Sequence, residues 1–145
     1  WEREMFERER EGLFAAVGTY ILDSVTKWSD SLMFAILQTG TRGKSRVGQI
    51  PELQDYLTQQ LTSIDWIGKI MSFPCHTVVT GHIGVMKDEL TGGTMTGLLL
   101  AGKLSEKVPL SFDEKYVTLG KETSAGIEYL LQTKNDGYFR AETRM

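Results

Sequence analysis

The chain has 145 residues and a mass of 16.3 kDa, the size of a single domain, and 41% of its residues are hydrophobic. This composition excludes a disordered chain, while the lone cysteine, Cys75, excludes an internal disulfide and fits a reducing cytosol. No apolar run approaches the ~20 residues of a membrane span, and the net charge of −3 argues against a constitutive binder of duplex DNA.

Residues 1–12 are expected to form a charged helical lead-in to a single domain that covers residues 1–145. Glutamate and arginine dominate this segment, and the four-residue spacing of Glu4 and Arg8 is typical of a solvated helix that ends at Gly12. Because Trp1, and not Met, opens this helix, we expect the chain to begin inside a longer protein.

A buried strand and a helix follow. The apolar run Thr19–Leu22 does not alternate with polar residues, which is typical of a strand covered on both faces, as in a parallel sheet. Either Asp23 or Ser24 can cap the next helix, because both side chains accept hydrogen bonds from free backbone N–H groups. Apolar residues at helical spacing predict that this helix runs from Val25 to near Gly40.

The middle of the chain is predicted to be a loop and a long helix. The segment Thr39–Gly48 holds three glycines and three basic residues and is expected to be a basic surface loop. Pro51 suits a helix start. Apolar residues from Leu53 to Met71 follow the 3.6-residue period, and Pro74 ends the predicted helix.

The rest of the chain is predicted to be rich in strands. Thr77–Thr80 is a second buried strand, followed by a polar, glycine-rich stretch from Gly84 to Gly97. A hairpin is expected around the turn Asn135–Gly137. The C-terminal strands are predicted at Phe112–Leu119, Gly126–Thr133 and Tyr138–Arg144. Strands that alternate with amphipathic helices predict an α/β fold with a mainly parallel sheet flanked by helices, and the C-terminal β-meander would extend its edge antiparallel.

Asp23 and Ser24 form the first candidate site. They come directly after a buried strand, at the rim where open α/β sheets bind ligands. Mg²⁺ binds one or two carboxylates together with phosphate oxygens and water, so Asp23 is suited to hold the ion or its water, with help from Ser24. The alternative is that Asp23 only caps the helix.

His82 is the second candidate. It ends the other predicted parallel strand, so we expect it near Asp23. A neutral histidine there can sense a terminal phosphate by hydrogen bonding and move the loop that follows. The alternative is a structural polar residue. The motif Gly43-Lys44-Ser45 is not the end of a phosphate loop, because Gln38 replaces the required glycine.

Five segments of the sequence carry a resemblance in their order and spacing: Tyr20–Trp28, Phe73–His82, Phe112–Val117, Tyr129–Gly137 and Arg140–Arg144. They resemble segments of RecA-like P-loop ATPases, particularly the small phage-encoded AAA-family nucleotide-binding proteins associated with recombination and single-strand annealing. The first segment is similar to a Walker B strand. The second is similar to the strand that ends at the γ-phosphate sensor.

The resemblance implies that Asp23 is the Walker B aspartate, with Ser24 beside it, and that His82 takes the sensor position, where RecA itself usually has glutamine. It implies ATP and Mg²⁺ as cofactors, a homo-oligomeric ring or filament, and DNA recombination or repair in the cytoplasm of a bacterial host. Walker A and the strand before it occur nowhere in the sequence. We therefore expect an N-terminally truncated core that does not hydrolyse ATP alone.

Single-stranded DNA is the partner that the resemblance implies. The glycine-rich stretch from Gly84 to Gly97 would correspond to the family's DNA-contacting loop, in which Lys87 is the one basic residue and has two acidic neighbours. Arg42, Lys44 and Arg46 are the better candidates, because their loop has no acidic residue and phosphate contacts need lysine or arginine.

Two other function classes stay open. One is a non-catalytic α/β binding or assembly module that has lost the nucleotide. The other is a metal-dependent nuclease, which needs clustered carboxylates, and the partners available to Asp23 would be Asp113 and Glu114.

Overall fold

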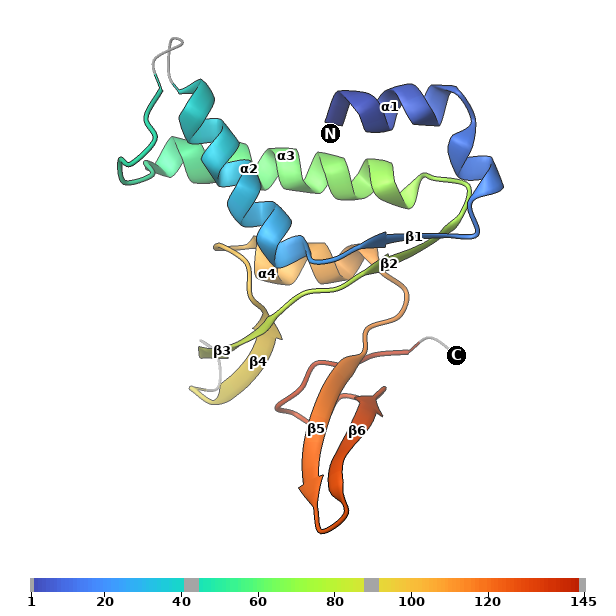
Figure 1. Cartoon of the computed structure of the whole chain (residues 1–145). Coiled ribbons are helices and arrows are strands. Elements are labelled where there is room, and N and C mark those ends of the chain that lie inside the picture. The colour runs from blue at the N-terminus through green and yellow to red at the C-terminus, as the bar shows by residue number, and fades with distance from the viewer. Residues whose placement is uncertain (1, 41–44, 88–91, 144–145) are drawn as a thin grey trace.

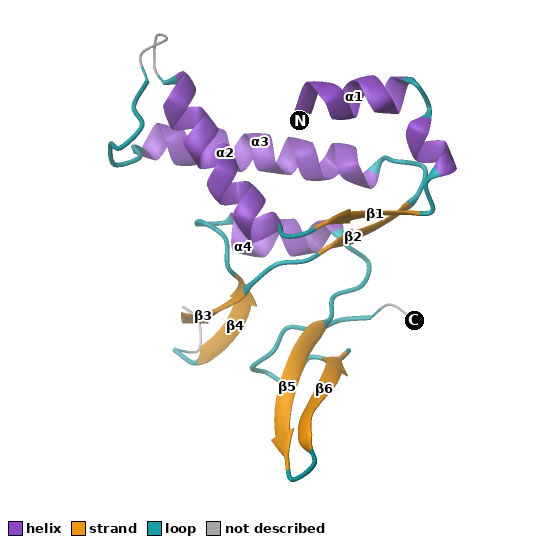
Figure 2. Cartoon of the chain, viewed as in Figure 1, coloured by secondary structure: helices purple, strands orange, loops and turns teal. Residues whose placement is uncertain are grey.

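A computed structural model describes residues 2–40, 45–87 and 92–143. In these ranges the helices are α1 (Glu2–Arg10), α2 (Val25–Thr39), α3 (Leu53–Met71) and α4 (Leu104–Lys107), with 3₁₀ turns at Leu13–Ala16 and Val108–Ser111. The strands are β1 (Thr19–Leu22), β2 (His76–Val79), β3 (Ile83–Lys87), β4 (Thr94–Leu98), β5 (Val117–Thr123) and β6 (Gly126–Gln132). Figures 1 and 2 show their arrangement.

The fold is mixed α/β, as predicted, but the strands form three separate pairs. In the described ranges β1 and β2 are parallel, whereas β3–β4 and β5–β6 are antiparallel hairpins. The expected mainly parallel sheet is thus a two-stranded one. The C-terminal hairpin does not extend its edge, because in the described residues β5 and β6 pair with each other and with neither β1 nor β2.

Local signals explain the N-terminal elements. Gly12, with a φ of 75°, ends α1, in the left-handed conformation that glycine adopts without strain. Ser24 caps α2 by accepting a hydrogen bond from the backbone N–H of Lys27, and Gly40 is the C-cap of that helix. These boundaries match the prediction.

The core lies where the C-terminal half of α3 meets the parallel pair and α4. Its fully buried side chains include Ile67 and Ile70 of α3, Val25 of α2 and Leu104 of α4. Aromatic rings close one end of this core, and the rings of Phe14 and Phe73, for example, stack 4.0 Å apart. Burial of this apolar surface is the main stabilising contribution.

Three C-terminal predictions need correction. The glycine-rich stretch from Gly84 to Gly97 is the hairpin β3–β4 and not a loop over its described part. The hairpin turn is Ser124-Ala125, and not Asn135–Gly137. In residues 138–143 the expected strand is reduced to isolated bridges. There the Asp136 carboxylate accepts hydrogen bonds from the backbone N–H groups of Tyr138 and Phe139, which lowers its pKa and holds the turn.

One long helix exposes much of its apolar side. Along the N-terminal half of α3 the buried positions are Asp55, Gln59 and Ser63, while Leu53 is 77% and Leu61 is 71% exposed. The helical period therefore predicted the element correctly, although in the N-terminal half of the helix the apolar stripe faces away from the core. Within the described ranges, no helix combines the length and the hydropathy that crossing a bilayer requires.

Candidate functional site

The carboxyl ends of β1 and β2 meet at one edge, as the sequence predicted. Leu22 pairs with Val79 in the parallel register. Beyond this pair the backbone N–H of Thr80 donates to the carbonyl of Leu22 at 3.0 Å, and the N–H of Val25 donates to the carbonyl of Thr80 at 2.9 Å. The first turn of α2 is therefore fixed to the segment that follows β2 (Figure 1).

Asp23 lies exposed at this edge and does not cap α2. Its Oδ1 accepts a hydrogen bond from the hydroxyl of Thr80, while the cap is Ser24, whose Oγ lies 3.4 Å from the N–H of Lys27. In the described part of the chain Oδ2 has no hydrogen-bond partner, and the residue as a whole is exposed. The hydroxyl of Thr80 orients the carboxylate, a role that sequence reasoning missed.

His82 lies at the same edge and lines a hollow in the surface. Its backbone N–H donates to the hydroxyl of Thr26 at 3.1 Å, and its carbonyl accepts from the N–H of Leu99 at 2.8 Å. The side chain is exposed and lines a hollow of about 680 Å³ between α2, α3 and the segment after β4. In the described part of the chain no hydrogen bond or ion pair joins the imidazole to Asp23, so joint action of the two side chains needs a ligand between them.

A buried amide lines the same hollow. Gln59 of α3 is 4% exposed and donates from Nε2 to the carbonyl of Ser29 at 2.8 Å and to its hydroxyl at 3.1 Å. Its Oε1 has no partner among the described atoms. Sequence reasoning missed Gln59, because a glutamine in a helix is ordinarily a solvent-facing residue.

The acidic residues are better suited to an ion that is also coordinated by a phosphate ligand than to a metal site built from protein side chains alone. In residues 2–40, 45–87 and 92–143, no three His, Cys, Asp or Glu side chains gather closely enough to hold a metal. A single exposed carboxylate is the donor that a magnesium ion shared with phosphate oxygens uses, and Asp23 fits this chemistry. The nuclease hypothesis lacks the acidic cluster with Asp113 and Glu114 that it requires.

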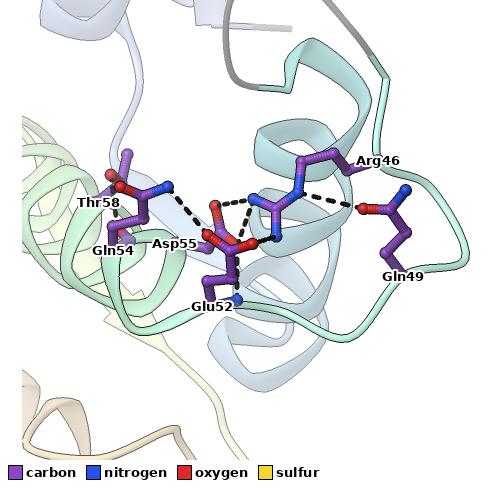
Figure 3. A network of polar contacts seen from close by, with 6 residues as sticks. All are labelled: Arg46, Gln49, Glu52, Gln54, Asp55 and Thr58. Carbon is purple, nitrogen blue, oxygen red and sulfur yellow. Dashed lines mark hydrogen bonds and ion pairs between the residues drawn. The ribbon is translucent and has the colours of Figure 1, made fainter.

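Arg46 is enclosed by carboxylates, as Figure 3 shows. Its Nη1 contacts both carboxylate oxygens of Asp55 at 3.0 and 2.9 Å, and its Nη2 lies 3.0 Å from Oε1 of Glu52. Its Nε donates to Gln49 at 3.4 Å. The side chain of Arg46 is 11% exposed and that of Asp55 is 8% exposed, so this is a largely buried ion pair in which one guanidinium nitrogen contacts both carboxylate oxygens.

This network fixes the end of the basic loop to both helices that flank it. The backbone N–H of Arg46 donates to the carbonyl of Leu37 in α2 at 2.7 Å. Asp55 also accepts from the N–H of Glu52 at 2.7 Å, which completes a capping box at the start of α3. The prediction that Arg46 contacts DNA therefore needs correction, because protein carboxylates occupy its guanidinium.

The other DNA candidates stand differently. Arg42 and Lys44 lie outside the described residues. Lys87 is exposed at the end of β3, five residues after His82, so it is open to solvent on the β3–β4 hairpin.

Comparison with known proteins gives no relative to argue from. No protein-family model matches the chain, and no curated protein and no solved structure matches it.

Proposed function

We propose that this chain is the Walker B and sensor half of a RecA-like ATPase core of phage type, which acts in DNA recombination or repair. The observation that supports this most is the placement of Asp23, exposed at the tip of a parallel strand with Thr80 of the neighbouring strand segment holding one carboxylate oxygen. In α/β sheets this rim is the ligand side. Ser24 serves as the helix cap, which leaves Asp23 available.

In this proposal the chain's own residues orient the metal ion and the phosphate groups of the nucleotide. Asp23 accepts hydrogen bonds from, or coordinates, a hydrated Mg²⁺ that supplies charge stabilisation for phosphoryl transfer, a reaction that depends mainly on positioning and electrostatics. His82 donates a hydrogen bond to the terminal phosphate. Because its backbone is bonded to Leu99, just after β4, a shift of His82 moves the β3–β4 hairpin that carries Lys87.

The parallel pair carries signs of a wider sheet. Ile21 and Val78 are cross-strand neighbours, 60% and 46% exposed, although parallel sheets are normally covered on both faces. A further parallel strand and helix that bring the phosphate loop would cover them. Without that loop, we propose that this chain alone does not bind Mg–ATP tightly, and that the complete protein forms a ring or filament with single-stranded DNA as its partner.

The second candidate is a non-catalytic assembly module. The exposed apolar stripe of α3, with Leu53 and Leu61, favours it, because stripes of this kind mark interaction surfaces. The coding sequence upstream of Trp1 distinguishes the two functions. The ATPase requires codons upstream of Trp1 that encode an apolar strand followed by G-x-x-x-x-G-K-[ST]. A reading frame that encodes no such motif contradicts the ATPase and leaves the module.

Asp23→Asn tests the assigned role in the protein that includes that upstream part. Steady-state turnover of Mg–ATP should fall at least about a hundredfold, because the ion loses its charged ligand while the side chain keeps its shape. Asp65→Asn is the matched control, since Asp65 is an exposed acid on α3, paired with Lys69 at 2.7 Å and away from the hollow that His82 lines. Equal turnover in the two variants would exclude Asp23 from the site.

A further inference from the structure

The C-terminal hairpin presents a free edge along β6. In the described ranges β6 pairs with β5 alone, and Figure 1 shows its other side open. Thr123 and Gly126 flank the two-residue turn and are paired, so they exchange backbone hydrogen bonds. From this pair onward, hydrogen-bonded pairs and non-hydrogen-bonded pairs alternate along the hairpin. The backbone N–H and C=O groups directed away from β5 therefore belong to Ile127, Tyr129 and Leu131.

The same three residues form an apolar stripe on one face. Their side chains are 60%, 82% and 57% exposed. On β5 they face Glu122, Gly120 and Thr118, which offer little apolar cover. A two-stranded hairpin alone is marginally stable in water, and a long, flat edge with apolar side chains is a template for another strand. An added strand would use both the backbone groups and the stripe.

We propose that β6 pairs antiparallel with β6 of a second copy of this chain, across a two-fold axis at Tyr129. In this register Tyr129 lies opposite Tyr129 of the second copy, and Ile127 lies opposite Leu131. All outward backbone groups of both strands then find partners, which gives six interchain hydrogen bonds in the alternation that antiparallel strands require. The product is a four-stranded sheet with a continuous apolar stripe, stabilised by cross-strand aromatic and aliphatic pairs.

Charge selects this register. A copy of the chain is favoured as the partner because the outward apolar stripe is self-complementary about Tyr129, with an aliphatic residue two positions to either side of the aromatic one. Glu128 is the one charged residue of β6. With the axis at Tyr129 it faces Leu130 of the second copy, whereas an axis at Glu128 would place two carboxylates opposite each other, which is destabilising. An axis at Leu130 would leave Ile127 opposite Thr133, beyond the strand. The interface is independent of the nucleotide site proposed above.

Cysteine cross-linking tests the axis directly in the full chain, in a Cys75→Ser background. Tyr129→Cys should form a disulfide-linked dimer under mild oxidation, because directly opposed residues lie within the Cα distance that a disulfide spans. Thr118→Cys is the control, since Thr118 has an exposed side chain on the same hairpin but lies on the far strand, out of reach of its copy. Equal cross-linking at the two positions, or none at Tyr129→Cys, would overturn the proposal.

A proline pair tests the edge without cysteine chemistry. Tyr129→Pro removes an outward N–H and leaves the β5–β6 hydrogen bonds intact, so sedimentation velocity should show a dimer dissociation constant raised at least about tenfold. Thr118→Pro removes an N–H from the opposite edge and should leave the dimer unchanged. A wild-type chain that stays monomeric at about 100 µM, or a dimer that survives Tyr129→Pro, would contradict β6 pairing.

Discussion

The strands β1 and β6 are both short apolar runs, but β1 has one covered face, whereas β6 is exposed on both faces over most of its length. In β1, Leu22 is 8% exposed, and Tyr20 packs its ring edge against Phe14 and Phe73 at 5.8 and 5.6 Å. In β6, Tyr129 is 82% exposed. β1 lies beside the aromatic core and α3, whereas no helix contributes a layer over either face of β6 in the described part of the chain.

This difference shows that an apolar run predicts a strand whose side chains are suited to burial. It does not predict whether the same chain or another molecule covers them. Where the chain itself supplies a second layer, as around β1, burial provides stability. Where it does not, the strand is free to bind another molecule. We therefore expect changes in the core to alter folding, and changes in the hairpin to alter association.

The largest effect should come from Ile70, which is 0% exposed in the core of α3. Ile70→Ala removes fully buried methyl groups and leaves a cavity, so the free energy of unfolding should fall by about 2–5 kcal/mol. Ile127→Ala removes the same atoms from a side chain that is 60% exposed, and the free energy of unfolding should change by less than about 0.5 kcal/mol. Urea unfolding of both variants as dilute monomers measures the contrast, and similar losses would refute it.

Arg46 should give the next largest effect. Arg46→Met leaves the buried carboxylate of Asp55 without its cation, and the free energy of unfolding should fall by about 3 kcal/mol. Arg46→Lys should recover only part of this loss, because an ammonium restores the charge but lacks the separate nitrogens that contact Asp55, Glu52 and Gln49. Lys27→Met breaks an exposed pair with Asp30 and should cost less than about 0.5 kcal/mol.

The comparison of Arg46 with Lys27 decides whether the end of the basic loop is part of the folded core. If the Arg46→Met variant unfolds as the Lys27→Met variant does, the network in Figure 3 contributes nothing to stability and Arg46 is again available to an external phosphate.

Elements that carry their own local signals were predicted well. The run Thr19–Leu22 is the observed β1, and the helix expected from Val25 to near Gly40 is α2. Their boundaries depend on a cap, a glycine and a uniform apolar run, which are contained in a few neighbouring residues. At the candidate site, the meeting of two parallel strand ends was predicted correctly, and Asp23 contacts Thr80 there. In the described part of the chain no hydrogen bond joins Asp23 to His82, and the roles assigned to both residues stay predictions.

Elements set by distant contacts were predicted poorly. The glycines of β3–β4 suggested a loop, but Gly84 and Gly97 are paired, and a Cβ at Gly97 would lie 2.4 Å from the sulfur of Met86. These glycines permit close packing and do not mark a loop. The ion pair of Arg46 and the inward amide of Gln59 likewise depend on helices that meet only in the folded chain.

The smallest predicted effect on stability concerns the candidate site. There we expect Ser24 to contribute to the stability of the fold and Asp23 to contribute to ligand binding. Ser24→Ala removes the cap of α2, and at an Oγ–N distance of 3.4 Å the free energy of unfolding should fall by about 0.5–1 kcal/mol. Asp23→Asn should change it by less than about 0.5 kcal/mol, because the side chain is exposed and an amide oxygen still accepts from Thr80. Thermal and urea unfolding measure both variants.

A large loss of stability in Asp23→Asn would mean that the carboxylate supports the fold, as Ile70 does. It would then be unsuited to read out a ligand. A small loss places Asp23 with the exposed residues of β6, whose side chains contribute little to folding and remain free to bind. The combination of a stable fold and lost turnover in Asp23→Asn is therefore what the nucleotide proposal requires, and Ser24→Ala supplies the opposite pattern for comparison.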